Sequence, residues 1–160
     1  ALPKGKAVLV LGYLLAFGLF AAVQALLSAT VALTLLDLDV AGPTWAVILV
    51  AVLVGLLGTA LGLALSAFAR NEFQAVQFMP AVVFPQFLLC GLLAPREDMS
   101  PVLRAISDVL PLSYAVDAMG NITTQSGVST DTWWALAIVT AFIVASVAAG
   151  ALTLRRSARG

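Results

Sequence analysis

The sequence predicts an all-α fold: a polytopic membrane helix bundle of four transmembrane helices, with two short re-entrant or interfacial helices before the last span. Apolar residues make up 62% of the 160 residues and charged residues 10%, against about 25% charged residues in soluble domains. The run from Ala7 to Leu36 contains no charged residue, and an apolar stretch of about 18 residues is enough for a transmembrane helix. Further apolar segments follow along the chain, so we expect a single membrane domain over residues 1–160.

The first two spans are expected at about 7–36 and 44–68. The first is longer than a hydrocarbon core of about 30 Å requires, so it should tilt or protrude. It is also too long for the apolar region of a cleavable signal peptide, and no small-residue cleavage pattern follows it. Gly42 and Pro43 form a helix-breaking pair in the turn between the two spans.

The third span is expected at about 74–94. Asn71 with Gln74 three residues later is typical of a helix N-cap box, which indicates where this helix begins. Pro80 and Pro85 each remove a backbone hydrogen bond, so we expect a kink or a break within the membrane.

The polar segment 95–131 follows, and the last span is expected at about 132–154. Ser100 and Pro101 are typical of an N-cap followed by a first-turn proline, which predicts a short helix that Pro111 ends. The apolar side chains of this helix share one face: Val102, Leu103, Ile106, Val109 and Leu110.

On the other face of this first short helix, Arg104 and Asp108 are four residues apart and can pair. A second short helix should cover about 112–120, and residues 121–131 should form a polar loop. Neither helix is long enough to span a bilayer and each has an apolar face. We therefore expect both to lie at the interface or to dip into the membrane as a re-entrant pair.

The distribution of charge predicts the orientation of the chain. If the spans alternate, one side carries six basic residues and a single acid, Glu72. The basic residues are Lys4, Lys6, Arg70, Arg155, Arg156 and Arg159. The other side carries Arg96 and Arg104 with seven acids: Asp37, Asp39, Glu97, Asp98, Asp108, Asp117 and Asp131. The positive-inside rule then places both termini in the cytoplasm, and Trp45, Trp133 and Trp134 at the outer interface.

Small residues lie along one face of the second span: Gly55, Gly58, Gly62 and Ser66. Small residues allow helix backbones to approach closely in lipid. Packing within the chain is the favoured interpretation, and a dimer contact is the alternative.

Polar side chains in the first span are candidates for a transport path. Gln24 and Ser28 are four residues apart and share a helix face, which fits a polar patch on a path through the membrane. The alternative is a hydrogen bond between helices, or a hydroxyl that bonds back to its own helix.

The third span is irregular where Pro85 and Gln86 precede Cys90, Gly91 and Pro95. Freed backbone groups at membrane depth are tolerated where protein or a wet cavity satisfies them. This favours the interior of a bundle and a gate, with a proline kink that merely fits its neighbours as the alternative.

The sequence gives no candidate catalytic, cofactor-binding or metal-binding residue. It contains no His and a single Cys, which removes the commonest general base and any disulfide framework within the chain. No Gly-rich nucleotide-binding loop occurs, and nothing indicates a nucleic-acid partner. Asn121-Ile122-Thr123 matches a glycosylation acceptor, a pattern common by chance, and we interpret it as incidental.

The order of motifs between 58 and 119 resembles the permease subunit of ABC-2 type exporters, especially the daunorubicin-resistance-like branch. The matching positions are Gly62 to Arg70 (a Gly-rich face and a Ser-Ala-x-Ala-Arg stretch), Pro85, Cys90-Gly91, Pro95, Leu110 to Tyr114 (Leu-Pro-Leu-x-Tyr), and Asp117-Ala118. Cys90 stands where that family usually has Ser. Near the start, Ala1-Leu2-Pro3 and Leu11-Gly12-Tyr13 look like the family's entry to its third span, with Tyr13 in place of Lys.

The resemblance implies that the chain corresponds to the family's third to sixth spans, with two spans preceding Ala1. It implies a non-catalytic permease that pairs with a second permease copy in the lipid bilayer of the bacterial cytoplasmic membrane. A separate or fused ABC ATPase would use the ATP, and the cargo would be drug-like, lipid-like or saccharide.

On this interpretation we expect Gln24, Ser28 and Gln86 to line the translocation path, along or between spans one and three. An outer gate is expected to involve Pro85, Gly91, Pro95, Pro111, Tyr114 and Asp117.

The alternative functions are an intramembrane enzyme and a small non-transporting membrane protein. An intramembrane enzyme is disfavoured because no nucleophile–base set or paired intramembrane acids occur. A small non-transporting membrane protein, such as an immunity or assembly partner, would need no ATPase and stays open at this point.

Overall fold

The computed structural model describes residues 4–69 and 71–156. Within these ranges the chain is helical and contains no strand. The helices are α1 (Lys4–Thr34), α2 (Thr44–Phe68), α3 (Glu72–Leu89), the 3-10 helix η1 (Arg96–Asp98), α4 (Pro101–Ser107), α5 (Pro111–Thr124) and α6 (Thr130–Arg156). The expectation of an all-α fold is therefore confirmed.

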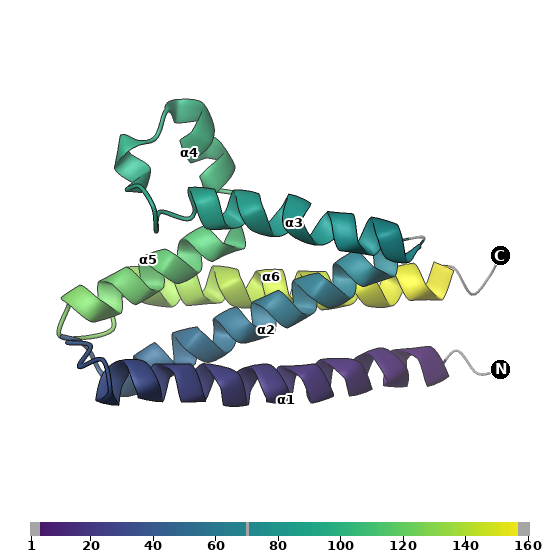
Figure 1. The fold of residues 1–160 in the computed structure, drawn as a ribbon, viewed down its shortest axis with the longest axis horizontal. Helices are drawn as coiled ribbons and strands as arrows, with labels where there is room; N and C mark the ends of the chain where they lie inside the picture. The colour runs from purple at the N-terminus through teal and green to yellow at the C-terminus, as the bar shows by residue number, and fades with distance from the viewer. Residues whose placement is uncertain (1–3, 70, 157–160) are drawn as a thin grey trace.

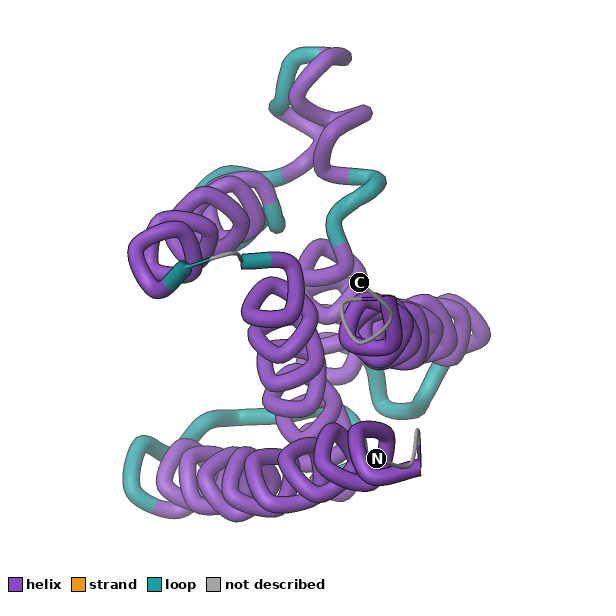
Figure 2. The backbone as a smooth tube through the Cα atoms, turned by 90° about the vertical axis from the view of Figure 1, so that its right-hand side faces the viewer, coloured by secondary structure: helices purple, strands orange, loops and turns teal. Residues whose placement is uncertain are grey.

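Helix α2 is the centre of the bundle. It packs extensively against α1 on one side and α6 on another, with lighter contacts to α5 and α3. The chain returns from the end of α2 through α3 and then α5, and α4 projects from the side of the bundle near the end of α3 (Figure 1). The view along the bundle shows that α1 and α3 lie on opposite sides of α2 (Figure 2).

Three of the described helices are long and apolar enough to cross a membrane: Gly12–Thr34, Thr44–Phe68 and Thr130–Thr153. They correspond to the predicted first, second and last spans, and the bounds of α2 coincide with the prediction. Helix α1 begins earlier than predicted and ends at Thr34 instead of residue 36.

Helix α3 is not among these candidates, so the prediction of a fourth span is not confirmed. It has 18 residues, which at about 1.5 Å per residue gives a length of roughly 27 Å, at the lower limit for a span. Glu72, three glutamines and two prolines lower its hydropathy.

The predicted N-cap of α3 is confirmed, because the Asn71 side chain accepts a hydrogen bond from the backbone N–H of Gln74 at 2.8 Å. The helix runs without interruption through Pro80 and Pro85, so the expected break does not occur there. Instead the helix ends at Leu89, five residues before the predicted end at 94. The reason is Gly91, whose φ of +97° turns the chain away from the helix axis.

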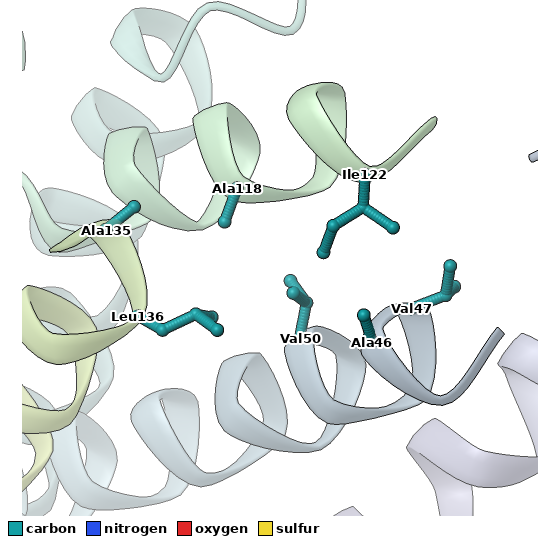
Figure 3. Close-up of a cluster of buried hydrophobic side chains, with 7 residues drawn as sticks. All are labelled: Ala46, Val47, Val50, Ala118, Ile122, Ala135 and Leu136. Carbon is teal, nitrogen blue, oxygen red and sulfur yellow. The ribbon is translucent and has the colours of Figure 1, made fainter. Parts of the chain in front are cut away.

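The core lies where α2, α5 and α6 meet (Figure 3). Its buried side chains are Ala46, Val47 and Val50 of α2, Ala118 and Ile122 of α5, and Ala135 and Leu136 of α6. Val139 of α6 and Ala115 of α5 continue it with Leu57 of α2. The small side chains in this set allow the three helices to approach closely.

Helix α5 is longer than the predicted 112–120 because tertiary packing extends it to Thr124. Ile122 is fully buried against α2, which holds the last turn in place. The Thr123 and Thr124 hydroxyls also donate to the Gly120 carbonyl at 2.9 and 2.7 Å. The polar loop therefore begins at Gln125, and not at residue 121 as predicted.

The turn between α1 and α2 contacts the C-terminal end of α5. The backbone N–H groups of Ala41 and Gly42 donate to the carbonyls of Thr123 and Ile122 at 3.1 and 3.0 Å. A helix end leaves its last carbonyls without an intrahelical partner, and here the turn supplies the donors. The backbones are so close that a Cβ at Gly42 would lie 2.5 Å from the Ile122 carbonyl oxygen.

Helix α4 presents its apolar face outward. Val102 is 70% exposed and Val109, just after the helix, is 65% exposed, whereas Ser107 is fully buried. The predicted pairing of Arg104 with Asp108 is wrong, because Asp108 pairs with Arg96.

The two ends of the bundle differ in composition. Helix α1 begins and α6 ends at one end (Figure 1). Trp45 and Trp133 lie together at the start of α2 and α6, with ring centroids 6.4 Å apart. Of the basic residues used to predict the orientation, Arg70 and Arg159 lie outside the described residues.

Candidate functional site

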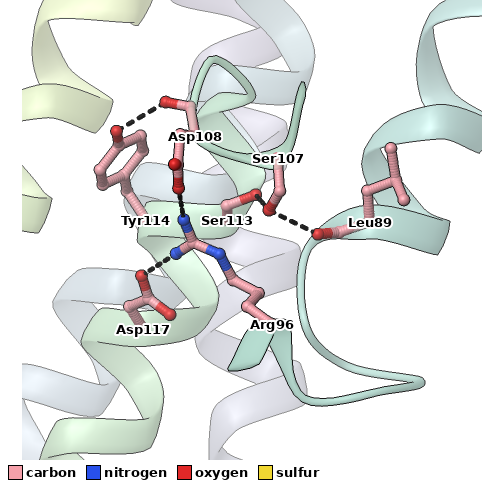
Figure 4. Close-up of polar contacts among 7 residues, drawn as sticks. All are labelled: Leu89, Arg96, Ser107, Asp108, Ser113, Tyr114 and Asp117. Atoms are coloured by element: carbon pink, nitrogen blue, oxygen red, sulfur yellow. Dashed lines mark hydrogen bonds and ion pairs between the residues drawn. The ribbon is translucent and has the colours of Figure 1, made fainter. Parts of the chain in front are cut away.

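Arg96 is the centre of a polar cluster at the C-terminal ends of α3 and α4 and the N-terminal half of α5 (Figure 4). Its two terminal nitrogens form ion pairs with Asp108, just after α4, and with Asp117 of α5. The Arg96 side chain is 17% exposed, and those of Asp108 and Asp117 are 51% and 43% exposed. A single guanidinium therefore joins three segments of the chain through its planar set of donors.

Tyr114 supports this cluster from α5. The Arg96 guanidinium carbon lies 6.0 Å from the centroid of the Tyr114 ring, within the range of a cation–π contact. The Tyr114 hydroxyl donates to the backbone carbonyl of Asp108 at 2.6 Å. Tyr114 thus contacts the cation and also fixes the backbone of one of its partners.

Two buried hydroxyls connect the ends of three helices beside this cluster. The Ser107 hydroxyl donates to the Leu89 carbonyl at 2.7 Å. That carbonyl belongs to the last residue of α3, where no intrahelical donor is available. The Ser107 oxygen lies 3.0 Å from the Ser113 oxygen, so α3, α4 and α5 meet through one hydrogen-bonded chain (Figure 4).

Gly91 shapes the turn that brings Arg96 to the cluster. With φ at +97°, it adopts a conformation that other L-residues rarely take. A Cβ at this position would also lie 3.3 Å from Cγ of Arg96. The turn therefore requires glycine for its conformation, and the Arg96 side chain leaves little space for a Cβ at this position.

A cavity of about 850 Å³ lies between this turn, α5 and the start of α6. Its charged lining residues are Arg96, Glu97, Asp117 and Asp131, so acids outnumber bases. Trp134 and Tyr114 add aromatic surface. Among the described residues, no group of three or more Cys, Asp or Glu side chains is arranged to hold a metal ion.

The structure brings together four of the six residues predicted to form an outer gate. Gly91, Pro95, Tyr114 and Asp117 all line the cavity. The other two lie elsewhere: Pro85 is exposed on α3, and Pro111 is buried at the start of α5.

A smaller apolar pocket of about 150 Å³ lies between α2 and α3. Gly58, Gly62 and Gln86 line it. Gln86 is 6% exposed, and its amide nitrogen makes a long 3.4 Å bond to the Val82 carbonyl in its own helix. The amide therefore faces an apolar pocket between two helices.

The structure does not bring the three predicted path residues together within one chain. Gln24 and Ser28 are exposed on α1, and Gln86 is buried on α3. Helix α2 lies between these two helices (Figure 2).

The small residues of α2 have different surroundings. Gly55 packs against α1, where its added Cβ would lie 3.3 Å from Ala21. Gly58 and Gly62 have no such neighbour within 4 Å, and Ser66 is exposed. Close packing within the chain is therefore observed at Gly55 and not at Gly58, Gly62 or Ser66.

Sequence reasoning missed Arg96, Asp108, Ser107 and Ser113 as members of this cluster. One signal was available for Arg96, because it is one of two bases among seven acids on its side of the chain. Nothing in the sequence indicated the role of the two serines. A hydroxyl can be identified as a bridge between helix ends only when the positions of those ends in space are known.

Comparisons with known proteins point to a transporter. The family model described as ABC-2 type transporter matches residues 5–124. "ABC transporter G family member 20" of Dictyostelium discoideum is 33% identical over 76 residues, which cover 48% of this chain and 10% of that protein. "Nodulation protein J" of Neorhizobium galegae is 32% identical over 65 residues, which cover 41% of this chain and 25% of that protein. The matched segments are thus a quarter or less of these relatives, and no solved structure matches the chain.

Proposed function

The chain belongs to the ABC-2 type transporter family, and from this premise we propose that it is a membrane-spanning permease part of an ATP-driven exporter. The observation that carries the proposal is the family match over 5–124, on a chain whose three long apolar helices suit a multi-pass membrane protein. The protein would not hydrolyse ATP through these residues. An ABC ATPase, separate or fused, would supply the energy.

The proposed arrangement places both termini of this chain in the cytoplasm of a bacterium and the tryptophan end of the bundle outside. The basic residues predicted to face the cytoplasm support it, together with the grouping of Trp45 and Trp133 at the opposite end. In this arrangement α3 would make the return crossing. Helices α4 and α5 would then form the re-entrant region at the outer leaflet.

We propose a path for cargo that involves Gln24, Ser28 and Gln86. Since α2 separates these residues within one chain, a path lined by all three requires a second permease copy. The lining has few fixed charges, which favours an amphipathic or apolar cargo of the drug-like, lipid-like or saccharide classes. Replacement of Gln24 and Gln86 by Leu in the full-length protein should reduce export, whereas Gln77→Leu, an exposed position on α3, should not.

The test of the function is purification of the tagged full-length protein from its native membrane. Co-elution of an ABC ATPase, with ATP-dependent export in reconstituted vesicles, is the expected result. Recovery of the intact protein with no ATP hydrolysis in the eluate or in the vesicles would contradict the proposed exporter function. That result would favour a non-transporting membrane partner instead.

A further inference from the structure

The smaller pocket, which lies between α2 and α3 and is here called the α2–α3 pocket, has a volume of about 150 Å³. Its lining residues are valine, leucine, methionine and glycine, except for Gln86 of α3. Leu57 of α2 is buried, whereas Met79 and Val83 of α3 are exposed. The pocket therefore extends from the surface of α3 to the core beside α2.

Two glycines of α2 leave this space open. A Cβ at Gly58 or Gly62 would have no neighbour within 4 Å, whereas a Cβ at Gly55 would lie 3.3 Å from Ala21. Gly58 and Gly62 are four residues apart, so they lie on the same face of α2. Helix α3 packs only lightly against α2, and its side chains do not fill the space that the two glycines leave.

Gln86 supplies an observation that is independent of the glycines. This residue is 6% exposed and lines the pocket. Within the described part of the chain its carboxamide makes one hydrogen bond, from Nε2 to the Val82 carbonyl at 3.4 Å, which is longer than the usual range of about 2.7–3.2 Å. The carboxamide oxygen accepts no hydrogen bond from the described residues. A buried amide with this unused capacity favours a ligand that donates to it.

The lining of the pocket determines the chemical class of its occupant. Among the described residues no charged side chain lines it, so an ion would lose its hydration without gaining a partner. Drug-sized molecules need pockets of about 300–1,000 Å³, which exceeds the volume of this one. An apolar cavity of about 150 Å³ in another protein binds benzene, so a single six-membered ring is the size that fits.

Two further features favour a ring that carries a hydroxyl group. Met79 lines the pocket, and methionine sulfur makes favourable contacts with aromatic rings. A rigid ring also loses less conformational freedom on binding than a flexible acyl chain does. An acyl chain would leave the Gln86 carboxamide against hydrocarbon, whereas a hydroxyl on the ring would complete its hydrogen bonding.

We propose that the α2–α3 pocket is a binding site for a small neutral phenol. The ring lies between the glycines of α2 and the side chains of Met79 and Val83, and its hydroxyl donates to the carboxamide oxygen of Gln86. One copy of the chain forms the site. Binding therefore depends neither on the cargo path proposed above nor on an ATPase.

The methyl group of Met79 can report on occupancy, because a bound aromatic ring shifts the resonance of a nearby methyl group through its ring current. The experiment titrates phenol into the full-length protein in lipid nanodiscs, with isotopically labelled methionine methyl groups, and Met79→Leu identifies the Met79 signal. Met99 and Met119 do not line the pocket and serve as references. We expect a saturable shift for Met79 and none for Met99 or Met119.

Leucine substitutions at the two glycines should block the pocket. Gly58→Leu should weaken phenol binding by about tenfold or more, because the added side chain occupies the space of the ring. Gly62→Leu fills the pocket from the next turn of α2 and tests it if Gly58→Leu protein does not fold. Gly12→Leu is the matched control, since a Cβ at Gly12 also has no neighbour within 4 Å but lies on α1. Its phenol affinity should stay within about twofold of that of the wild type.

Replacement of Gln86 tests the hydroxyl group separately. Toluene has the size of phenol, with a methyl group in place of the hydroxyl. The ratio of the two affinities is compared between Gln86→Leu and the wild type, which cancels the different partition of the two ligands into lipid. Loss of one hydrogen bond should lower the preference for phenol by about fivefold.

The proposal is supported if Gly58→Leu or Gly62→Leu removes a saturable Met79 shift that Gly12→Leu retains, and if Gln86→Leu lowers the preference for phenol. Shifts that rise without saturation at all three methionines would show partition into lipid only and would overturn it. An unchanged Met79 shift in both glycine variants, or an unchanged preference in Gln86→Leu, also overturns it. None of these measurements uses ATP or an ATPase, so they are independent of the test for export.

Discussion

At the residue scale, Gly42 is a position where the backbones of two distant segments lie close together. A methyl group there would lie 2.5 Å from the Ile122 carbonyl oxygen, and this oxygen is part of the backbone and cannot move alone. Gly42→Ala should lower the free energy of unfolding by about 1–3 kcal/mol, since the turn or the end of α5 must shift. Thermal unfolding of the purified full-length protein in detergent measures it.

Gly12→Ala is the control for this prediction. Gly12 lies in α1, and a Cβ there has no neighbour within 4 Å, so alanine should be neutral or slightly stabilising in the helix. Equal unfolding temperatures for Gly42→Ala and the wild type would show that the turn does not contact α5 as described.

Replacement of Ser107 should also lower the free energy of unfolding. Its hydroxyl is the donor for the Leu89 carbonyl, and it is buried beside Ser113. Ser107→Ala leaves both groups without this partner, which should cost about 1–3 kcal/mol. Ser126→Ala, in the exposed loop before α6, should leave the unfolding temperature unchanged. A similar loss in both variants would contradict a specific role for the Ser107 hydroxyl.

At the element scale, the exposed apolar face of α4 should contact the outer leaflet. Spin labels at Val102→Cys and Arg104→Cys, both in a Cys90→Ser background, would lie on opposite faces of this helix. The label at 102 should be more accessible to oxygen than to a water-soluble nickel complex, and the label at 104 should show the reverse. Equal accessibility to the nickel complex at both positions would indicate that α4 lies in water.

The sequence predicts the long helices well and the short ones less well, for a physical reason. An uncharged apolar run determines a membrane helix by its length, so the bounds of α2 coincide with the prediction. The ends of α3 and α5 depend on contacts that are far apart in sequence. Gly91 ends α3 by a positive φ, and burial of Ile122 extends α5 beyond the expected stop at Gly120.

At the scale of the whole molecule, the positions of the loops lead to a prediction about topology. Gly127 lies in the loop before α6 and Glu72 lies at the start of α3, and both are exposed. In a Cys90→Ser background, Gly127→Cys should react with a membrane-impermeant maleimide added to intact cells. Glu72→Cys should react only after the membrane is permeabilised. The opposite pattern would contradict the orientation derived from the basic residues.

The candidate site could be predicted in part. Gly91, Pro95, Tyr114 and Asp117 were expected at an outer gate and meet at one cavity. The role of Arg96 could not be derived, because its partners are 12 and 21 residues away. The local spacing of Arg104 and Asp108 suggested a different pair. A four-residue spacing shows that two charges can meet in a helix, but it does not exclude a better partner elsewhere.

The hydrogen bonds between the turn after α1 and the end of α5 have a consequence for biosynthesis. Gly42 leaves the ribosome 80 residues before Ile122 does. At about 5–20 residues per second, this interval lasts on the order of 4–16 s. Throughout that time the donors of the turn after α1 are still unpaired by protein. The nascent chain becomes locked at this point only when α5 emerges, so the turn and the end of α5 pair late in synthesis.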